Sequence, residues 1–261
     1  MIGMIGAGNM AKAMIGGMLK KGVCKPEDII VSSKTEATRN AIQEEYQVQI
    51  AQNNQAVAKE ADILFFAVKP YLYEEVMTEV KEDIKENAIL VSIAPGKTIE
   101  FLEGLVGTDK KIVRTMPNTP AMVLEGMTAV CFNSNMGTED QKRILDILGS
   151  FGKAEVVPEK LMDVVVSVSG SSPAYVFMFI EAMADAAVAD GMPRKQAYRF
   201  AAQSVLGSAK MVLETGMHPG ELKDMVCSPG GTTIEAVRVL EEKGMRSAVI
   251  EAMKACTKKA R

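Results

Sequence analysis

A glycine-rich turn directly after a short apolar strand is the feature that most constrains the fold of this 261-residue chain. The apolar residues 2–5 are followed by Gly6-Ala-Gly-Asn-Met-Ala11, and then by a helical pattern that ends near Lys21. In such a turn the first glycine permits a tight bend, and the second lets a pyrophosphate approach the backbone. Ala11 allows the helix to pack closely on the strand. In a strand–helix–strand context this spacing predicts a dinucleotide-binding domain, whereas a tight turn without a ligand is the alternative.

Alternating strand and helix patterns continue from this turn to about residue 158. Apolar strands separated by helices are typical of a parallel sheet covered on both faces. We therefore expect an α/β, Rossmann-type doubly wound parallel sheet over residues 1–158. The expected strands are 2–5, 28–32, 62–68, 88–93, 111–115, 127–132 and 154–157. The expected helices are one ending near residue 21, then 35–46, 71–84, 98–106 and 138–150.

Beyond Pro158 the sequence contains helical patterns only, which predicts an all-α domain over residues 159–261. Its expected helices are 159–167, 173–190, 194–214, 221–226, 233–243 and 246–258. The helix 173–190 is apolar nearly all round, so we expect it to be covered on all sides. So short a domain offers little interior, which favours cover by a second subunit in a symmetric dimer. Burial within one chain is the alternative.

The second strand ends in Ser32-Ser33-Lys34, and Arg39 follows one helical turn later. An NAD site would carry Asp or Glu near this position for the ribose hydroxyl. Hydroxyl groups and a cation suit a 2′-phosphate instead, so we expect preference for NADPH, with NADH possible. A solvated turn is the alternative, because exposed charges are ordinary there.

Two further segments follow strands at the same edge of the expected sheet. Ala67-Val-Lys-Pro70 ends one strand, and Asn118 lies in the stiff loop Met116-Pro-Asn-Thr-Pro120 after another. Ligands bind at the carboxyl ends of strands in such sheets, so Asn118 is a candidate for the nicotinamide carboxamide or the substrate. Simple turns are the alternative for both segments. The predicted cofactor-binding residues are Gly6, Ala7, Gly8, Asn9, Met10, Ser32, Ser33, Lys34, Asn53, Ala67, Val68, Lys69, Pro70 and Asn118.

A second glycine-rich turn lies late in the chain, in Val226-Cys-Ser-Pro-Gly-Gly-Thr-Thr-Ile-Glu235. Pro229 fixes one backbone angle, and the two glycines permit conformations that other residues avoid. The turn leads into a helical pattern, and the start of a helix presents free N–H groups and a positive dipole end. A carboxylate fits such a site. An ordinary capped helix start is the alternative.

Composition argues against several other classes of protein. The 30 basic and 33 acidic residues nearly balance, and no basic run is interleaved with aromatics, so we expect no nucleic-acid partner. The four cysteines form no Cys-x-x-Cys pair, which favours reduced cytoplasmic thiols and no metal site. His218 lies in Met-His-Pro-Gly and is interpreted as a structural turn residue. The first residues do not resemble a signal peptide, and acidic residues interrupt the most apolar helix, so we expect no membrane partner.

The motifs together resemble the pyrroline-5-carboxylate reductase family over nearly the whole chain. The segments that carry the resemblance are Gly6-Ala-Gly-Asn-Met-Ala11, Ala67-Val-Lys-Pro70, Arg114-Thr-Met-Pro-Asn-Thr-Pro120, Ser169-Gly-Ser-Ser-Pro-Ala-Tyr175 and Ser228-Pro-Gly-Gly-Thr-Thr233. Two departures are small: Ser172 stands where many members have Gly, and Thr232 where some have Ala.

The resemblance implies a helical domain that dimerises, with dimers often joined into rings. It also implies that an imino-acid substrate binds at the late turn through N–H groups near Gly231 to Thr233. The implied substrate-binding residues are Val226, Ser228, Gly230, Gly231, Thr232 and Thr233, with the turn 169–173 forming part of the pocket floor. Thr233 is the implied catalytic residue, whose hydroxyl approaches the ring nitrogen.

The implied reaction is hydride transfer from NADPH to the carbon of a cyclic imine, which gives proline. A β-hydroxyacid-type dehydrogenase is one alternative, but it requires a catalytic lysine, and no Lys lies between Pro173 and Asp190. A non-catalytic NADP-sensing module is another, and it leaves the loop 226–233 unexplained.

Overall fold

The computed structural model describes residues 1–260 and divides into two compact units. One comprises residues 1–171 together with 257–260, and the other is Ser172–Cys256. The segment 159–171 belongs to the first unit because it packs on the sheet: Met162 and Val165 contact Ala129 and Cys131. The expected division into functional domains 1–158 and 159–261 remains a prediction.

The first unit is built on an eight-stranded sheet in the order β3-β2-β1-β4-β5-β6-β7-β8. Its strands are β1 (Ile2–Ile5), β2 (Ile29–Ser32), β3 (Gln49–Ile50), β4 (Ile63–Phe66), β5 (Ile89–Ser92), β6 (Lys111–Met116), β7 (Gly126–Phe132) and β8 (Gly152–Val156). All neighbours run parallel except β6 and β7, which are antiparallel. The sheet is therefore mostly parallel, as expected, with one antiparallel pair that the sequence analysis did not foresee. The connection 117–125 is too short for a parallel crossover, which needs about a dozen residues or more.

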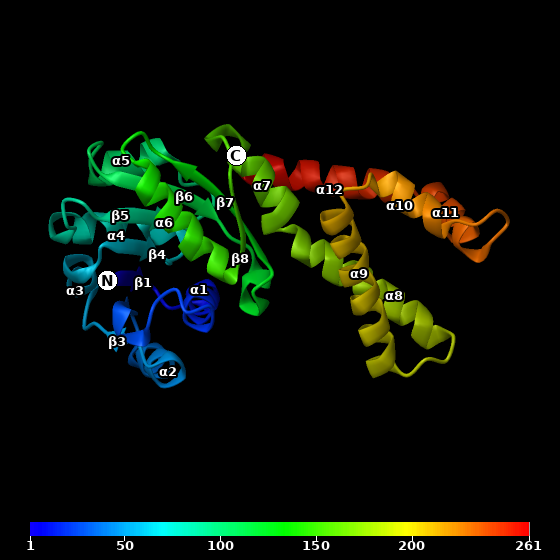
Figure 1. The fold of residues 1–261 in the computed structure, drawn as a ribbon, viewed down its shortest axis with the longest axis horizontal. Coiled ribbons are helices and arrows are strands. Elements are labelled where there is room, and N and C mark those ends of the chain that lie inside the picture. Colours follow the sequence, from blue (N-terminus) through cyan, green and yellow to red (C-terminus); the bar gives the residue numbers. More distant parts are fainter. Residues whose placement is uncertain (261) are drawn as a thin grey trace. The chain divides into compact units, whose positions relative to one another are not determined.

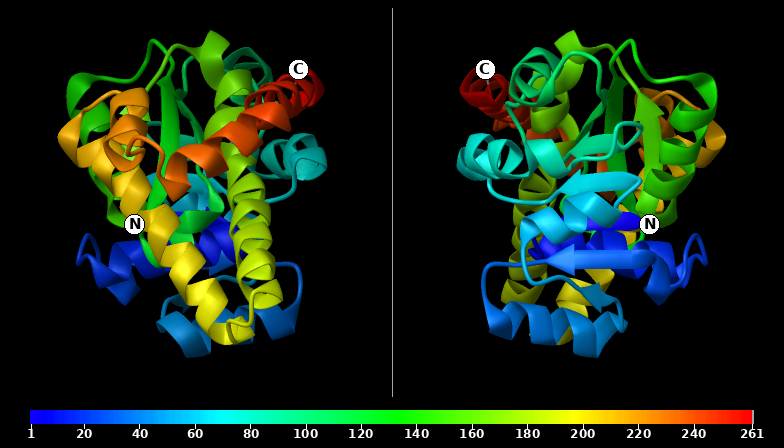
Figure 2. Two further views of the ribbon diagram at one scale, coloured as in Figure 1. Left: turned by 90° about the vertical axis from the view of Figure 1, so that its right-hand side faces the viewer. Right: turned by 90° about the vertical axis from the view of Figure 1, so that its left-hand side faces the viewer.

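Helices cover both faces of this sheet (Figures 1 and 2). On one face lie α1 (Asn9–Lys20), α2 (Glu36–Tyr46) and α6 (Thr138–Leu148), and on the other α3 (Asn54–Glu60), α4 (Tyr73–Val80) and α5 (Ile99–Val106). Strand side chains alternate between the two cores, as Phe65 and Phe66 do. The doubly wound arrangement predicted from the sequence is thus confirmed. Short 3₁₀ helices span Pro26–Asp28, Pro70–Leu72, Lys81–Asp83, Thr119–Val123, Gly149–Phe151 and Glu159–Leu161.

Beyond β8 the described chain is helical, as predicted. α7 (Met162–Val165) continues into a π-helix (Val166–Gly170), and then come α8 (Ser172–Ala189), α9 (Arg194–Thr215), α10 (Pro219–Val226), α11 (Thr232–Glu242) and α12 (Met245–Ala260). α8 and α9 form a helical hairpin (Figures 1 and 2). His218 caps α10, because its Nδ1 accepts a hydrogen bond from the N–H of Gly220 at 3.1 Å. Its predicted structural role is therefore confirmed.

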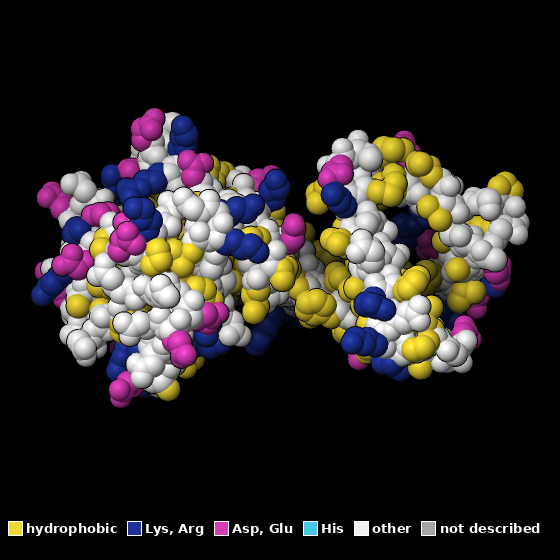
Figure 3. All heavy atoms as spheres, turned by 60° about the horizontal axis from the view of Figure 1, so that its bottom comes forward, with side chains coloured by type: hydrophobic (Ala, Val, Ile, Leu, Met, Phe, Trp, Pro, Cys, Tyr) yellow, Lys and Arg dark blue, Asp and Glu magenta, His cyan; other side chains and the backbone are white. Residues whose placement is uncertain are grey.

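The helical unit Ser172–Cys256 leaves the apolar helix α8 largely uncovered. Ala184 is its one buried residue, and the consecutive residues 176–179 are each between 38% and 68% exposed. Hydrophobic side chains also gather on the surface of α9, and Figure 3 shows many such side chains over the helical unit. Burial within the helical unit itself is therefore not what covers α8. By length and composition alone, the helical stretch Glu159–Ala189 is also long and apolar enough to span a membrane.

Candidate functional site

Three predicted cofactor segments meet at the carboxyl ends of β1, β2 and β4. Gly6 follows β1 with a φ of 101°, a left-handed conformation that favours glycine. Its N–H donates to the carbonyl oxygen of Ser32 at 3.0 Å. A Cβ atom on Gly6 would lie 2.4 Å from the carbonyl oxygen of Ala67. The turn after β1 is therefore held between the ends of its two neighbouring strands.

Gly8 precedes α1, and the space beside it is open. A Cβ atom on Gly8 would meet no other atom within 4 Å. No described side chain caps α1, so its first N–H groups are left for a ligand or for water. These groups and the positive end of the helix dipole attract an anion. Ala7 and Met10 pack into the core, so these two predicted residues offer a cofactor their backbone rather than their side chains.

Two cations lie at the turn between β2 and α2, Lys34 within the turn and Arg39 near the start of α2. Lys34 is exposed, and Arg39 donates from Nη1 to the carbonyl oxygen of Ser33 at 2.6 Å, which holds its guanidinium beside the turn. Within residues 1–260 neither cation has an ion-pair partner. Ser32 differs from the expectation of a free hydroxyl, because it is buried and its Oγ donates to Asn54 at 2.7 Å. Positive charge is thus available at this turn, whereas the Ser32 hydroxyl is engaged within the protein.

Two consecutive asparagines follow β3. Asn53, a predicted cofactor residue, caps α3 by accepting a hydrogen bond from the N–H of Ala56 at 2.9 Å. Asn54 was not singled out from the sequence, yet it links two elements. Its Oδ1 accepts from Ser32, and its Nδ2 donates to Glu79 at 2.8 Å. The side chain of Asn54 therefore lies at the end of β2, beside the predicted cofactor turn.

The segment Ala67–Pro70 leaves β4 at a strand end that Tyr73 fixes. The Tyr73 hydroxyl donates to the carbonyl oxygen of Phe66 at 2.5 Å and accepts from the N–H of Ile93 at 3.1 Å, so it ties β4 to β5. Burial raises the pKa of Tyr73 to about 12, so the phenol stays protonated. Val68 packs against the core, whereas Lys69 is exposed. Lys69 is thus the member of this segment with a charge free to reach a ligand.

The amide of Asn118 is engaged inside the first unit. Its Oδ1 accepts from the N–H of Met127 at 2.8 Å, and its Nδ2 donates to the carbonyl oxygen of Ser169 at 3.0 Å. The side chain therefore holds the Ser169 segment against the sheet. A direct contact of Asn118 with cofactor or substrate remains a prediction.

Arg114 on β6 anchors the helices that lead to Ser169. Its side chain is only 6% exposed, and its Nη1 contacts Oε1 of Glu159 at 2.9 Å. Its Nη2 lies 3.8 Å from Oδ1 of Asp163. The same Glu159 oxygen accepts a hydrogen bond from the N–H of Ile99 at 2.8 Å, at the start of α5. A buried charge thus joins β6, α5 and the segment 159–165.

The segment Ser169-Gly-Ser-Ser-Pro173 is helical apart from a bend at Ser171, which corrects the expectation of a turn. Gly170 ends the π-helix, the N–H of Ser171 donates to the carbonyl oxygen of Val166 at 2.7 Å, and α8 begins at Ser172. Only Ser171 therefore separates the π-helix, a wide helical turn, from α8. The predicted contribution of this segment to the pocket floor remains untested.

The late glycine-rich turn lies between α10 and α11 in the second unit. Gly230 has a φ of 65°, and the N–H of Gly231 donates to the carbonyl oxygen of Ser228 at 3.0 Å. This bond occupies an N–H that was expected to bind the substrate. The groups left at the start of α11 are those of Thr232, Thr233 and the next residue, because no side chain within residues 1–260 caps this helix. The backbone N–H groups that are free near this turn are therefore those in the first turn of α11.

The remaining predicted substrate residues lie around this turn. Val226 ends α10 with 64% of its surface exposed, Ser228 and Thr232 are exposed, and Thr233 is half-buried. No group of three or more His, Cys, Asp or Glu residues among the described residues is arranged to hold a metal ion.

A glycine turn after β1, an uncapped α1 and helices with an exposed apolar surface define a Rossmann-type dinucleotide-binding protein with an additional helical unit. Residues 1–96 match the family model "NADP oxidoreductase coenzyme F420-dependent". Residues 159–261 match the family model "Pyrroline-5-carboxylate reductase dimerisation".

Relatives cover nearly the whole chain. Pyrroline-5-carboxylate reductase of Escherichia coli is 56% identical over 99% of this chain and 96% of its own length. The enzyme of Methanosarcina acetivorans is 44% identical over 97% of this chain and 93% of its own. The chain therefore belongs to the pyrroline-5-carboxylate reductase family, whose members are oxidoreductases.

Solved structures agree with this assignment. The pyrroline-5-carboxylate reductase of Coxiella burnetii superposes with a TM-score of 0.92 at 34% identity, covering 99% of this chain and 96% of that one. The pyrroline carboxylate reductase of Plasmodium falciparum, solved with NADP bound, has a TM-score of 0.89 at 33% identity, with the same coverage.

Proposed function

We propose that this chain reduces 1-pyrroline-5-carboxylate to L-proline, with NADPH as the hydride donor. One hydride passes to the imine carbon and one proton reaches the ring nitrogen, so the C=N bond becomes a single bond and NADP⁺ is released. The observation that carries the proposal is the uncapped first turn of α11 after the Ser228–Gly231 turn, in a chain of this family. It offers backbone N–H groups to a carboxylate.

The reaction depends more on correct placement of the substrate and the cofactor than on a strong acid catalyst. An iminium carbon already accepts hydride readily, so the enzyme must chiefly hold the two reacting carbons about 3–3.5 Å apart. The loop Cys227–Thr233 contains no Asp, Glu or His to act as proton donor. We assign Thr233 a role in orienting the ring nitrogen and in relaying a proton through water, because a hydroxyl is too weak an acid to act alone.

The reaction is tested by following NADPH oxidation with purified protein. Added 1-pyrroline-5-carboxylate should give turnover, and a β-hydroxyacid under the same conditions should give none. Turnover of the hydroxyacid alone would assign a different dehydrogenase activity. NADPH binding without turnover of either compound would favour a sensing module.

Replacing Thr233 by alanine should lower kcat/KM for the imino acid by about tenfold, equivalent to about 1.4 kcal/mol of transition-state stabilisation. Steady-state kinetics with saturating NADPH measures the loss. Thr233→Ser keeps the hydroxyl and should retain most of the activity. A Thr233→Ala enzyme with unchanged turnover and affinity would remove the assigned role.

Lys34 and Arg39 support the preference for NADPH. A charge-assisted hydrogen bond contributes about 1.5–3 kcal/mol, so Lys34→Ala should weaken NADPH binding by about tenfold or more. NADH, which lacks the 2′-phosphate, should bind the variant nearly as it binds the parent. Lys21→Ala is the control, because this exposed lysine lies at the opposite end of α1 from Gly8. Titrations followed by cofactor fluorescence measure the affinities of the parent and both variants for each cofactor. A preference for NADH that survives Lys34→Ala would contradict the assignment.

The exposed apolar surface of α8 and α9 supports a homodimer, in keeping with the matched dimerisation model. We infer that a second copy, rather than lipid, covers this surface, that the protein is cytoplasmic and that it binds no nucleic acid. Light scattering of detergent-free protein should then give at least twice the mass of one chain, and a multiple of that mass would indicate a ring of dimers. Protein that stays monomeric, or that needs detergent to remain dispersed, would contradict the inference.

A further inference from the structure

Glu235 lies in the first turn of α11, the helix whose start is proposed to bind the substrate carboxylate. A carboxylate in a first turn is attracted by the free N–H groups and the helix dipole. That attraction stabilises the helix, but it is directed at the same positive helix end that an anionic substrate would use. An unrestrained Glu235 would therefore compete with the substrate for this end of α11.

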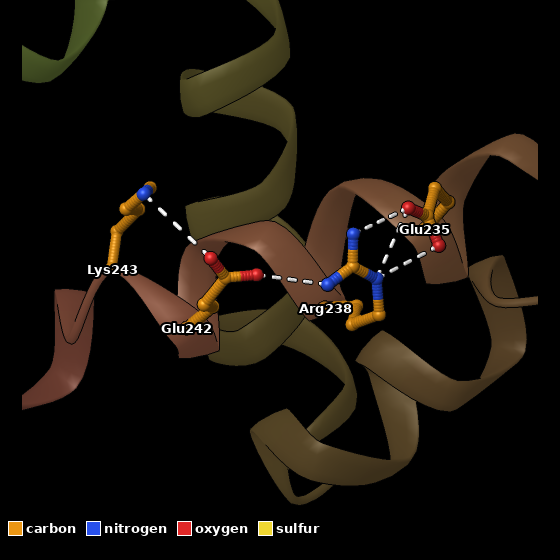
Figure 4. Close-up of polar contacts among 4 residues, drawn as sticks. All are labelled: Glu235, Arg238, Glu242 and Lys243. Atoms are coloured by element: carbon orange, nitrogen blue, oxygen red, sulfur yellow. Dashed lines mark hydrogen bonds and ion pairs between the residues drawn. The ribbon is translucent and has the colours of Figure 1, made fainter.

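Arg238 engages both carboxylate oxygens of Glu235 (Figure 4). Its Nε lies 3.0 Å from Oε1 and 3.1 Å from Oε2, and its Nη2 lies 2.7 Å from Oε1. Its Nη1 donates to Glu242 at 2.9 Å, and Lys243 lies 3.7 Å from the other oxygen of Glu242. These two acids and two bases balance one another, so the network carries no net charge.

The direction of these contacts matters as much as their charge. Arg238 lies three residues after Glu235, toward the carboxyl end of α11. Its guanidinium therefore restrains a carboxylate that could otherwise turn toward the free N–H groups of Thr232 and Thr233. The same contacts lower the pKa of Glu235, so the carboxyl group stays ionised and paired.

We propose that Arg238 is a positioning residue that neutralises Glu235 and keeps the start of α11 free for the substrate carboxylate. The proposal rests on the proposed function, because it requires an anionic substrate at this helix end. All four side chains are more than half exposed. Exposed ion pairs of this kind contribute little to stability, so the effect of the network should appear in substrate binding.

Arg238→Gln should raise KM for 1-pyrroline-5-carboxylate by about two- to fivefold at low ionic strength, the scale expected for one unpaired charge near a solvated site. The value of kcat and the affinity for NADPH should stay within about twofold. The rise in KM should shrink in about 1 M salt, where the Debye length is near 3 Å. Thermal unfolding of each variant shows whether the fold has changed.

Two further variants separate charge from structure. Arg238→Gln combined with Glu235→Gln should return KM to the parental value, because no unpaired carboxylate is left. Lys243→Gln alters the far end of the same network and should leave KM unchanged. An unchanged KM in Arg238→Gln at low salt would overturn the proposal, and so would a rise that the double variant does not reverse. If the parent protein itself does not reduce 1-pyrroline-5-carboxylate, the proposed function is refuted instead. Failure of the proposed function and failure of the role of Arg238 are therefore distinguishable.

Discussion

Gly6→Ala is expected to abolish measurable NADPH binding and to lower the free energy of unfolding by at least about 2 kcal/mol. A residue with a Cβ atom at a positive φ costs roughly 1–3 kcal/mol at such a site. Here the new Cβ would also lie 2.4 Å from the carbonyl oxygen of Ala67, a distance that requires the backbone to shift. The turn after β1 would then move away from the end of β4. Chemical denaturation and cofactor fluorescence titration measure the two losses.

Gly8→Ala is expected to affect cofactor binding without affecting the stability of the fold. Its Cβ would meet nothing within 4 Å, and the φ of Gly8 is −77°, so the chain tolerates the side chain with little strain. The added methyl would, however, enter the space where we expect the pyrophosphate. NADPH affinity should therefore fall by about tenfold or more, while the unfolding midpoint changes little. A Gly8→Ala protein that binds NADPH as tightly as the parent would place the cofactor elsewhere.

Most elements of the fold could be predicted from hydrophobic pattern alone, because long buried strands and helices impose clear periods. The exceptions have physical causes. β3 has only two residues, and neither is buried, so no strand pattern exists there. The antiparallel pairing of β6 and β7 depends on the length of the connection 117–125, not on the strands themselves. α3 has only seven residues, too few for a clear helical period. The capping residue Asn53 was the one feature of the sequence that could have indicated this helix.

Site residues could be predicted from the sequence where the backbone conformation requires glycine. The hydrogen-bond partners of side chains in the site could be predicted less well. Gly6 has the strained conformation that its motif indicates. The amide of Asn118 is a candidate for ligand contact, and the structure shows bonds to Met127 and Ser169 that the sequence did not indicate. Ser169 lies 51 residues away in the sequence, so only the tertiary structure reveals the pair. The N–H of Gly231 is likewise occupied by a local turn that sequence spacing alone does not specify.

Arg114→Met is expected to destabilise the protein by about 2–4 kcal/mol, because it leaves Glu159 and Asp163 without their buried cation. Removing one partner of a fully buried ion pair costs about 3–5 kcal/mol, and these carboxylates are each about one-third exposed, which lowers the cost. The loss should be measured by chemical denaturation at a fixed protein concentration, because association of subunits also contributes to stability.

Arg238→Met provides the matched control, since Arg238 also pairs with two carboxylates but is 58% exposed. Its loss of stability should be clearly smaller, because water replaces an exposed ion pair at little cost. Arg114→Lys should lie between the parent and Arg114→Met: an ammonium retains the charge, but it cannot serve both carboxylates with a planar fork. Equal losses for Arg114→Met and Arg238→Met would mean that burial of Arg114 does not govern its contribution. In that case the segment 159–165 would be held to the sheet by Met162 and its apolar neighbours instead.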